Sequence, residues 1–194
     1  MSPDIILNRQ EIIDGLTDVV RALAASGHPA TIQLVGGAAI ALTIDGDRPP
    51  TKDIDATVTP PELLRITATE VGRKRGWPDG WLDEDAAIFL PSQYGRGAEW
   101  VTLHDEGGVL VQAASPRMLL AMKLMAVMKR PLRDADDVAI LLAVNEVSSA
   151  DEAEAILEEF FPGDNLPPKT YALVEALIEQ GARDVNTPPA PRFV

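Results

Sequence analysis

The sequence has no cysteine at any of its 194 positions. Disulfides, thiolate zinc sites and cysteine nucleophiles are therefore excluded, and a bound metal would have to be held by carboxylates or histidines. The two histidines, His28 and His104, lie far apart in the chain. They lack the short spacing of a zinc-binding pair, so we expect neither to be a metal ligand.

Long apolar runs are also missing, since no stretch of eighteen apolar residues occurs. Residues 1–4 lack the basic and apolar regions that begin a secretory signal. We therefore expect a cytoplasmic protein with no membrane partner. Because 46% of the residues are hydrophobic and 24% are charged, the composition is that of a globular protein and excludes disorder throughout.

Basic residues are scarce, with 17 Lys and Arg against 30 Asp and Glu and a net charge of −13. This balance argues against a nucleic-acid partner, because phosphate binding depends largely on Lys and Arg. The shortage is uneven, since residues 48–133 carry twelve basic and eleven acidic groups, whereas residues 134–194 carry three and thirteen. An RNA or nucleotide is therefore expected to contact the middle segment, unless its basic residues are only solvated helix faces. These residues are the run 73–75 and the group Arg117, Lys123, Lys129, Arg130 and Arg133.

The order of the predicted elements places strands before helices. Runs rich in β-branched or apolar residues predict strands over 31–35, 54–59, 87–90, 100–104 and 109–112. Helical patterns, the first opened by a capping box at Asn8 and Glu11, are expected over 8–25, 38–43, 61–75, 116–129, 132–145, 150–160 and 168–181.

This order predicts an α/β (α+β) fold, with a small mixed β-sheet flanked by helices and a helical C-terminal portion. We expect a sheet lobe over residues 1–113, a helical lobe over 114–184 and a Pro-rich tail over 185–194. The tail is expected to be extended or disordered.

Two aspartates two residues apart, Asp53 and Asp55, fall at the start of a predicted strand. Alternate residues of a strand point to the same face, so both carboxylates should lie together while Ile54 faces the core. Neighbouring carboxylates repel, and a divalent cation lets both stay ionised. Their oxygens are the ligands that Mg²⁺ prefers, so the pair predicts a magnesium site, although Asp-x-Asp alone is common at strand ends.

A glycine pair, Gly36 and Gly37, lies upstream, between a predicted strand and a predicted helix. There, backbone amides and the positive end of a helix can approach a triphosphate, although a glycine pair alone is often only a turn. A hydrophobic residue, two glycines, a spacer and then Asp-hydrophobic-Asp-hydrophobic resembles the signature of the polymerase-β-like nucleotidyltransferases.

A second group of residues lies downstream. Lys123 occurs in a helix of Leu, Met and Ala, and Arg130, Arg133, Asp134 and Asp137 follow. This pattern resembles the Lys-x-x-Ala and Arg-x-x-Lys-Asp-x-x-Asp motifs of the nucleotidyltransferase toxins of the AbiEii and MenT type. Arg133 stands where that family usually has lysine. The family also has Ser or Thr two residues before the first aspartate, which here is Thr51.

The resemblance implies a toxin of a toxin–antitoxin system that transfers a nucleoside monophosphate from an NTP to the 3′ end of tRNA, with Mg²⁺ as the metal and Mn²⁺ as an alternative. An antitoxin protein would restrain it. The implied metal ligands are Asp53 and Asp55, and the implied catalytic residues are Asp53, Asp55, Lys123, Asp134 and Asp137. The implied nucleotide-binding residues are Gly36, Gly37, Thr51, Lys123 and Arg130.

The residues of the second group also have other interpretations. Lys123 either extends along an apolar helix surface or binds phosphate. Asp134 and Asp137 share a helical face, where they orient Lys123 and Arg130, position the acceptor, or form surface ion pairs.

Many polymerase-β-like enzymes have a third carboxylate, for which the sequence offers Glu99 and Asp105 as weak candidates. Two alternative functions stay open. One is nucleotidyl transfer to a small molecule or a protein hydroxyl, and the other is an inactive nucleotide-binding relative.

Overall fold

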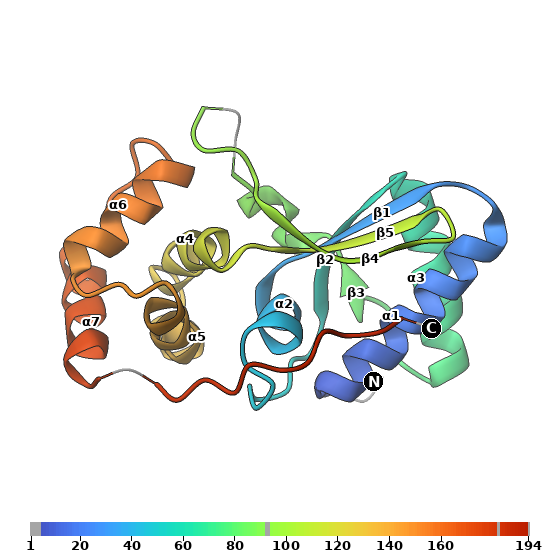
Figure 1. The fold of residues 1–194 in the computed structure, drawn as a ribbon, viewed down its shortest axis with the longest axis horizontal. Helices are drawn as coiled ribbons and strands as arrows, with labels where there is room; N and C mark the ends of the chain where they lie inside the picture. Colours follow the sequence, from blue (N-terminus) through green and yellow to red (C-terminus); the bar gives the residue numbers. More distant parts are fainter. Residues whose placement is uncertain (1–4, 92–93, 182, 194) are drawn as a thin grey trace. The chain divides into compact units, whose positions relative to one another are not determined.

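The computed structural model describes residues 5–91, 94–181 and 183–193 (Figure 1). Helices and a five-stranded mixed sheet confirm the expected α/β (α+β) class. The chain forms two compact units. Unit 1 comprises residues 1–88, 100–113 and 187–194, and unit 2 comprises residues 89–99 and 114–186. In the described part of the chain, no helix has both the length and the apolar character needed to cross a membrane.

The sheet of unit 1 has the strand order β3-β2-β1-β5-β4 (Figure 1). Strand β1 is antiparallel to β2 and parallel to β5, and β2 is parallel to β3. Strands β4 and β5 are neighbours joined by Gly107 and Gly108, both with positive φ, which confirms the predicted hairpin. The strands are β1 Ala30–Leu34, β2 Ile54–Thr59, β3 Leu82–Asp83, β4 Trp100–Glu106 and β5 Val109–Ala114.

One face of this sheet is buried and the other is polar. In β2, Ile54, Ala56 and Val58 are at most 3% exposed, whereas Asp55 and Thr57 on the opposite face are half-buried. Helix α1 (Arg9–Ser26) contacts α2 (Gly36–Thr43) and α3 (Pro61–Arg75), and both α2 and α3 contact β2. The alternation expected for the Asp-x-Asp strand is thus confirmed.

The polar face carries a row of side-chain hydrogen bonds across three strands. The Thr57 hydroxyl donates to Oε1 of Gln33 at 3.4 Å, and Nε2 of Gln33 donates to Oε1 of Gln112 at 3.1 Å. These side chains come from β2, β1 and β5 at paired positions of the sheet. The row therefore lies on the same face as Asp55, two residues along β2 from it.

Helix α1 begins and ends as its sequence predicts. Asn8 Oδ1 accepts from the Glu11 backbone N–H at 3.0 Å, and Glu11 Oε2 accepts from the Asn8 N–H at 2.8 Å, which completes the capping box. The helix ends at Gly27, which has φ of 72°. Helix α3 is fastened to α1 by Arg75, whose guanidinium pairs with Asp18 at 2.6 Å.

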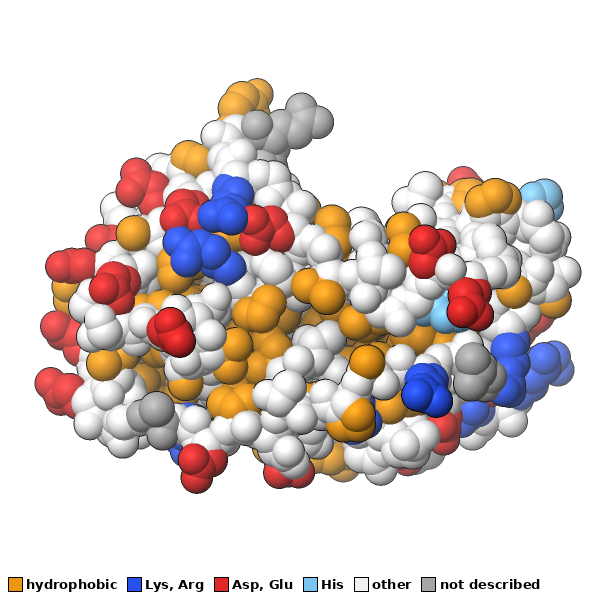
Figure 2. Space-filling model, viewed as in Figure 1, with side chains coloured by type: hydrophobic (Ala, Val, Ile, Leu, Met, Phe, Trp, Pro, Cys, Tyr) orange, Lys and Arg blue, Asp and Glu red, His pale blue; other side chains and the backbone are white. Residues whose placement is uncertain are grey.

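Unit 2 contains the four helices α4 (Pro116–Val127), α5 (Pro131–Val144), α6 (Ala150–Phe160) and α7 (Pro168–Glu179). Helix α4 packs against α5 and α6, and α7 packs against α5 and α6. The Arg96 N–H donates to the carbonyl of Glu159 at 2.6 Å, and the guanidinium groups of Arg96 and Arg117 both pair with the Glu159 carboxylate. Figure 2 shows acidic side chains gathered over α6 and α7.

One expectation about the segment after α3 is wrong, and one element there was missed. The strand predicted over residues 87–90 is a 3₁₀ helix, Asp85–Phe89, and the two-residue strand β3 before it was not expected. The Asp83 carboxylate accepts the backbone N–H of Asp85 at 2.9 Å. Such a local side-chain bond favours a turn over continuation of the strand.

The C-terminal tail is extended over residues 187–193 and belongs to unit 1. Nη2 of Arg9 donates to the Pro189 carbonyl at 2.6 Å. The Phe193 side chain is 3% exposed and meets the His104 ring edge-on, with centroids 6.0 Å apart. The tail therefore contacts unit 1 at both Pro189 and Phe193.

Gly15→Ala is expected to destabilise the protein. A Cβ at position 15 would lie 2.7 Å from the Trp77 ring and 2.9 Å from the Trp81 ring. Overpacking of this kind costs about 1–3 kcal/mol, which outweighs the roughly 1 kcal/mol that alanine gains over glycine in a helix. A lower urea midpoint than the wild type would support this result. Ala25→Gly, at an exposed position of the same helix, is the control and measures the difference in helix propensity alone. A Gly15→Ala variant more stable than the wild type would contradict the close packing at residue 15.

Candidate functional site

Asp53 and Asp55 lie at the start of β2, at one end of the sheet. Asp53 immediately precedes the strand and Asp55 lies within it, while Ile54 between them is fully buried. The Thr51 hydroxyl donates to Oδ1 of Asp53 at 3.3 Å. Thr51 is itself fixed by two backbone hydrogen bonds with Leu7, of 2.6 and 3.0 Å. The segment that carries the two carboxylates is thus fixed by hydrogen bonds to Leu7 before Asp53 and by strand pairing after it.

The glycine pair lies against the same strand. Gly36 has φ of 63°, a left-handed conformation that favours glycine, and a Cβ at this position would collide with Oδ2 of Asp55. The Val35 N–H donates to the Asp55 carbonyl at 3.0 Å. The start of α2 and the second aspartate therefore have a fixed relation, as the joined motifs require.

A third carboxylate, which sequence reasoning missed, lies beside this pair. Asp83 of β3 is the register partner of Asp55 in a parallel pairing, and Ile54 pairs with Leu82. Paired residues of neighbouring strands share a face, so Asp83 and Asp55 lie on the same side of the sheet. The pKa of Asp83 is raised, first by burial and also by the charges of Asp85 and Asp53.

The carboxylates suit a divalent cation only with help from a ligand. Among the described residues, no group of three or more His, Asp or Glu is arranged to hold a metal ion by itself. Mg²⁺ is usually bound by one or two carboxylates, with water and substrate phosphates filling its other positions. Asp53 and Asp55 supply two such carboxylates, and the pKa of the neighbouring Asp83 is raised by burial first and then by the charges of Asp85 and Asp53.

The second predicted group comes together within unit 2. Nζ of Lys123, on α4, lies 2.7 Å from Oδ1 of Asp134 and 2.7 Å from Oδ2 of Asp137, both on α5. The side chains of Lys123, Asp134 and Asp137 are 12%, 2% and 6% exposed. The predicted orientation of Lys123 by the two aspartates is present, and the lysine does not run along an open surface.

Arg130 is the exposed member of this cluster. Its Nε lies 3.4 Å from Oδ2 of Asp134, within ion-pair range, yet that buried oxygen has no hydrogen-bond partner among the described residues. The distance is too long for a good charge-assisted hydrogen bond, so we treat the contact as a weak ion pair. Because the Arg130 side chain is 51% exposed, its guanidinium is accessible to an anion.

The two sequence candidates for a third carboxylate have different surroundings. Glu99, in unit 2, accepts hydrogen bonds from Arg96 at 2.6 Å and from the Ser115 hydroxyl at 2.9 Å. Asp105 is an exposed residue of β4, which β5 and β1 separate from β2. Asp105 is therefore not beside Asp55 in the sheet.

Several basic residues expected to meet phosphate have protein partners instead. Arg75 pairs with Asp18, Arg117 pairs with Glu159, and Lys123 pairs with the two aspartates of α5. Lys129 lies 5.0 Å from the ring centroid of Phe89. Each of these four basic residues therefore has a contact within the protein, whereas contact of the middle segment with an RNA or nucleotide stays a prediction.

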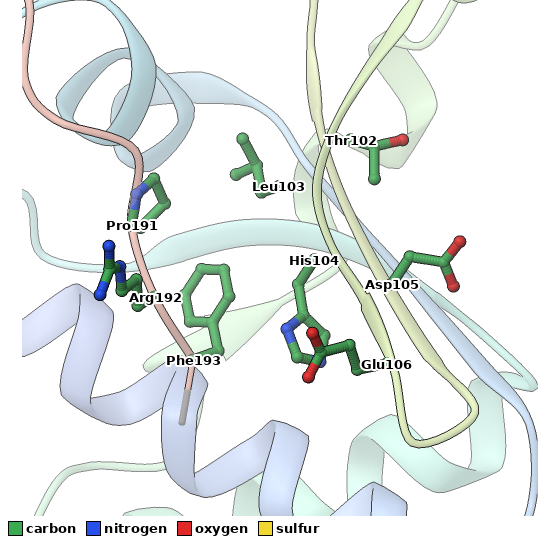
Figure 3. Close-up of a pocket in the computed structure, with 8 residues that line it drawn as sticks. All are labelled: Thr102, Leu103, His104, Asp105, Glu106, Pro191, Arg192 and Phe193. Carbon is green, nitrogen blue, oxygen red and sulfur yellow. The ribbon is translucent and has the colours of Figure 1, made fainter.

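Two cavities are lined entirely by described residues. A cavity of about 390 Å³ is lined by residues 102–106 of β4 and by the tail residues 191–193 (Figure 3). Figure 3 shows the Phe193 ring between the tail and His104. A second cavity, of about 200 Å³, lies between α3 and the loop before β3. Neither of these two cavities is lined by Asp53 or Asp55.

No protein-family model, curated protein or solved structure matches the chain. Its function is therefore inferred from the described residues and the motifs that they carry.

Lys123→Met is expected to reduce the free energy of unfolding by about 3–5 kcal/mol, because it leaves two buried carboxylates without their cation. Urea denaturation at neutral pH measures the change. Lys129→Met is the matched control, since Lys129 is exposed and its contact with Phe89 is worth no more than about 1 kcal/mol. Equal effects of the two changes would contradict the buried cluster.

Asp83→Asn is expected to stabilise the metal-free protein at neutral pH. The pKa of Asp83 is higher in the folded state, so its favourable contribution is complete below its ordinary pKa and is lost as pH rises through the folded value. The gain from Asn should therefore be smallest near pH 4 and grow toward pH 7. Urea unfolding in EDTA across this range tests it, with the exposed Asp79→Asn as control. A gain that falls with rising pH would contradict it.

Proposed function

We propose that this protein is a metal-dependent nucleotidyltransferase that transfers a nucleoside monophosphate from an NTP to an RNA acceptor. The proposed acceptor is the 3′ end of tRNA, and extension of that end would block aminoacylation in the cytoplasm. The observation that carries the proposal is the placement of Asp55 on the polar sheet face, beside Asp83 and the Gly36 turn, with Asp53 directly before the strand and close enough for its charge to act on Asp83.

Residues of unit 1 are proposed to bind the metal and the phosphates of the NTP. Asp53 and Asp55 would hold Mg²⁺ or Mn²⁺, with Thr51 positioning Asp53. When bound, the metal neutralises charge on the phosphates of the NTP. The amides of Gly36 and Gly37, at the start of α2, are suited to contact those phosphates.

The transfer step forms one bond and breaks one. An acceptor hydroxyl attacks the α-phosphorus, the bond from that phosphorus to the oxygen bridging to the β-phosphate breaks, and pyrophosphate leaves. The hydroxyl proton needs an acceptor. Asp83 suits this role because it lies beside Asp55 and its pKa is raised, which makes it a better base than an ordinary aspartate.

The cluster of unit 2 has a supporting role in this proposal. The motif resemblance gives Lys123, Asp134 and Asp137 active-site positions. Because two carboxylates lie 2.7 Å from the Lys123 ammonium, its charge is already balanced, which favours a positioning role over direct phosphate contact. Arg130 is the member whose exposure suits contact with an anion.

An antitoxin protein is the further partner that the resemblance proposes. The acidic side chains over α6 and α7 suit a basic protein surface.

The proposal is tested by incubating the protein with total tRNA, Mg²⁺ and each α-labelled NTP in turn, followed by denaturing electrophoresis. Wild-type protein should label tRNA with at least one nucleotide. Asp53→Asn should lower the rate by at least about 100-fold, because charge stabilisation of the transition state is lost. Asp105→Asn, an equally conservative change on β4, should leave the rate within about twofold.

The other outcomes separate the alternatives. Label on protein, or on a small molecule added as acceptor, would replace RNA as the substrate class. Absence of any nucleotide binding in calorimetry with Mg²⁺ would favour an inactive relative. Equal labelling by wild type and Asp53→Asn would contradict the assignment of the site.

A further inference from the structure

The loop between α2 and β2 places one guanidinium group at the glycine pair. A Cβ built on Gly37 would lie 2.7, 2.8 and 2.9 Å from Nη2, Cζ and Nη1 of Arg48. Three nearly equal distances mean that the flat face of the guanidinium covers Gly37. A side chain at residue 37 would therefore displace the Arg48 guanidinium, and one at residue 36 would collide with the Asp55 carboxylate.

The position of Arg48 is fixed by its own loop. Asp45 is 7% exposed, and its carboxylate accepts the Asp47 N–H at 3.2 Å, while its carbonyl accepts the Arg48 N–H at 3.3 Å. Two prolines follow, and Nη1 of Arg48 donates to the Pro49 carbonyl at 2.9 Å. The loop then joins the segment that Thr51 holds against Leu7. These hydrogen bonds therefore fix the position of the Arg48 side chain within the loop.

The Arg48 guanidinium brings positive charge to the start of α2. A helix start carries a partial positive charge, so a cation there is unfavourable unless negative charge is nearby. Arg48 lies over the second residue of α2, while Asp55 lies against the first. Its fork of N–H donors matches the oxygens of a phosphate, and the half-buried site shields the contact from water.

We propose that Arg48 binds the β- and γ-phosphates of the NTP and thereby makes the site prefer triphosphates over monophosphates. This inference rests on the proposed nucleotidyl transfer. Gly37 acts through Arg48, since any side chain at position 37 displaces the guanidinium. The pyrophosphate that leaves is then the group that Arg48 holds while negative charge builds up on it.

The test compares binding of NTP and of the matching NMP by calorimetry with Mg²⁺, using whichever nucleotide the wild-type protein binds. Arg48→Gln should weaken NTP binding by about 10- to 100-fold, the usual effect of losing a hydrogen bond to a charged group. Its effect on NMP binding should be no more than about threefold, because an NMP lacks the β- and γ-phosphates. Arg48→Lys keeps the charge without the fork and should fall between the two.

Two further variants complete the design. Gly37→Ala should weaken NTP binding without removing any charge, because its Cβ pushes the guanidinium away. Arg65→Gln on α3, an exposed arginine, is the matched control and should bind NTP as the wild type does. Thermal unfolding of each variant checks that it is folded.

The possible failures are distinguishable. Wild-type protein that binds no NTP, or that binds it equally after Asp53→Asn, would overturn the proposed function and the role of Arg48 together. Wild-type binding that requires Asp53 but is unchanged by Arg48→Gln would overturn the role of Arg48 alone. Equal losses of NTP and NMP binding in Arg48→Gln would likewise overturn the phosphate assignment, since they indicate a role in holding the loop.

Discussion

The contact between Asp55 and the Cα side of Gly36 constrains the whole carboxylate edge. No side chain fits at residue 36, whose positive φ also lets the chain reverse directly from β1 into α2. Because Asp55 is also a residue of β2, this one contact ties the helix start to the strand that carries the acidic pair. Asp83 joins the edge through strand pairing, and Arg48 joins it through the neighbouring glycine.

The two groups of charged residues differ in how their charges are balanced. In unit 2, the Lys123 ammonium lies 2.7 Å from each of two buried carboxylates, and the Arg130 guanidinium adds a weaker pair with Asp134. In unit 1, burial and then the charges of Asp85 and Asp53 raise the pKa of Asp83. A cation bound there would lower the repulsion between these carboxylates.

The features that followed from the sequence were those with local physical causes. The capping box at Asn8, the alternation around Ile54 and the hairpin at Gly107 each depend on a few neighbouring residues. Asp83 was missed because a two-residue strand has no periodic pattern, and its partner lies far away in sequence.

Other features depended on packing that no pattern reveals. Arg48 was missed because nothing in an Asp-Gly-Asp-Arg-Pro-Pro loop indicates where its guanidinium will lie. The strand predicted over 87–90 is wrong because its apolar residues follow a turn, in which the Asp83 carboxylate accepts the Asp85 N–H. The apolar pattern alone does not reveal that turn. The sequence left two alternatives for Lys123, an apolar helix surface or a charged site. The 2.7 Å distances from its Nζ to Asp134 and Asp137 favour the second.

The burial of the Lys123 cluster also determines how unit 2 responds to ionic strength. Dissolved ions screen exposed charges over about 10 Å at 0.1 M salt, but they screen buried pairs much less. The Arg183–Asp136 pair, with side chains 48% and 80% exposed, is open to such screening, whereas the carboxylates facing Lys123 are not. The packing of α4 on α5 should therefore persist in concentrated salt that loosens the surface pairs around it.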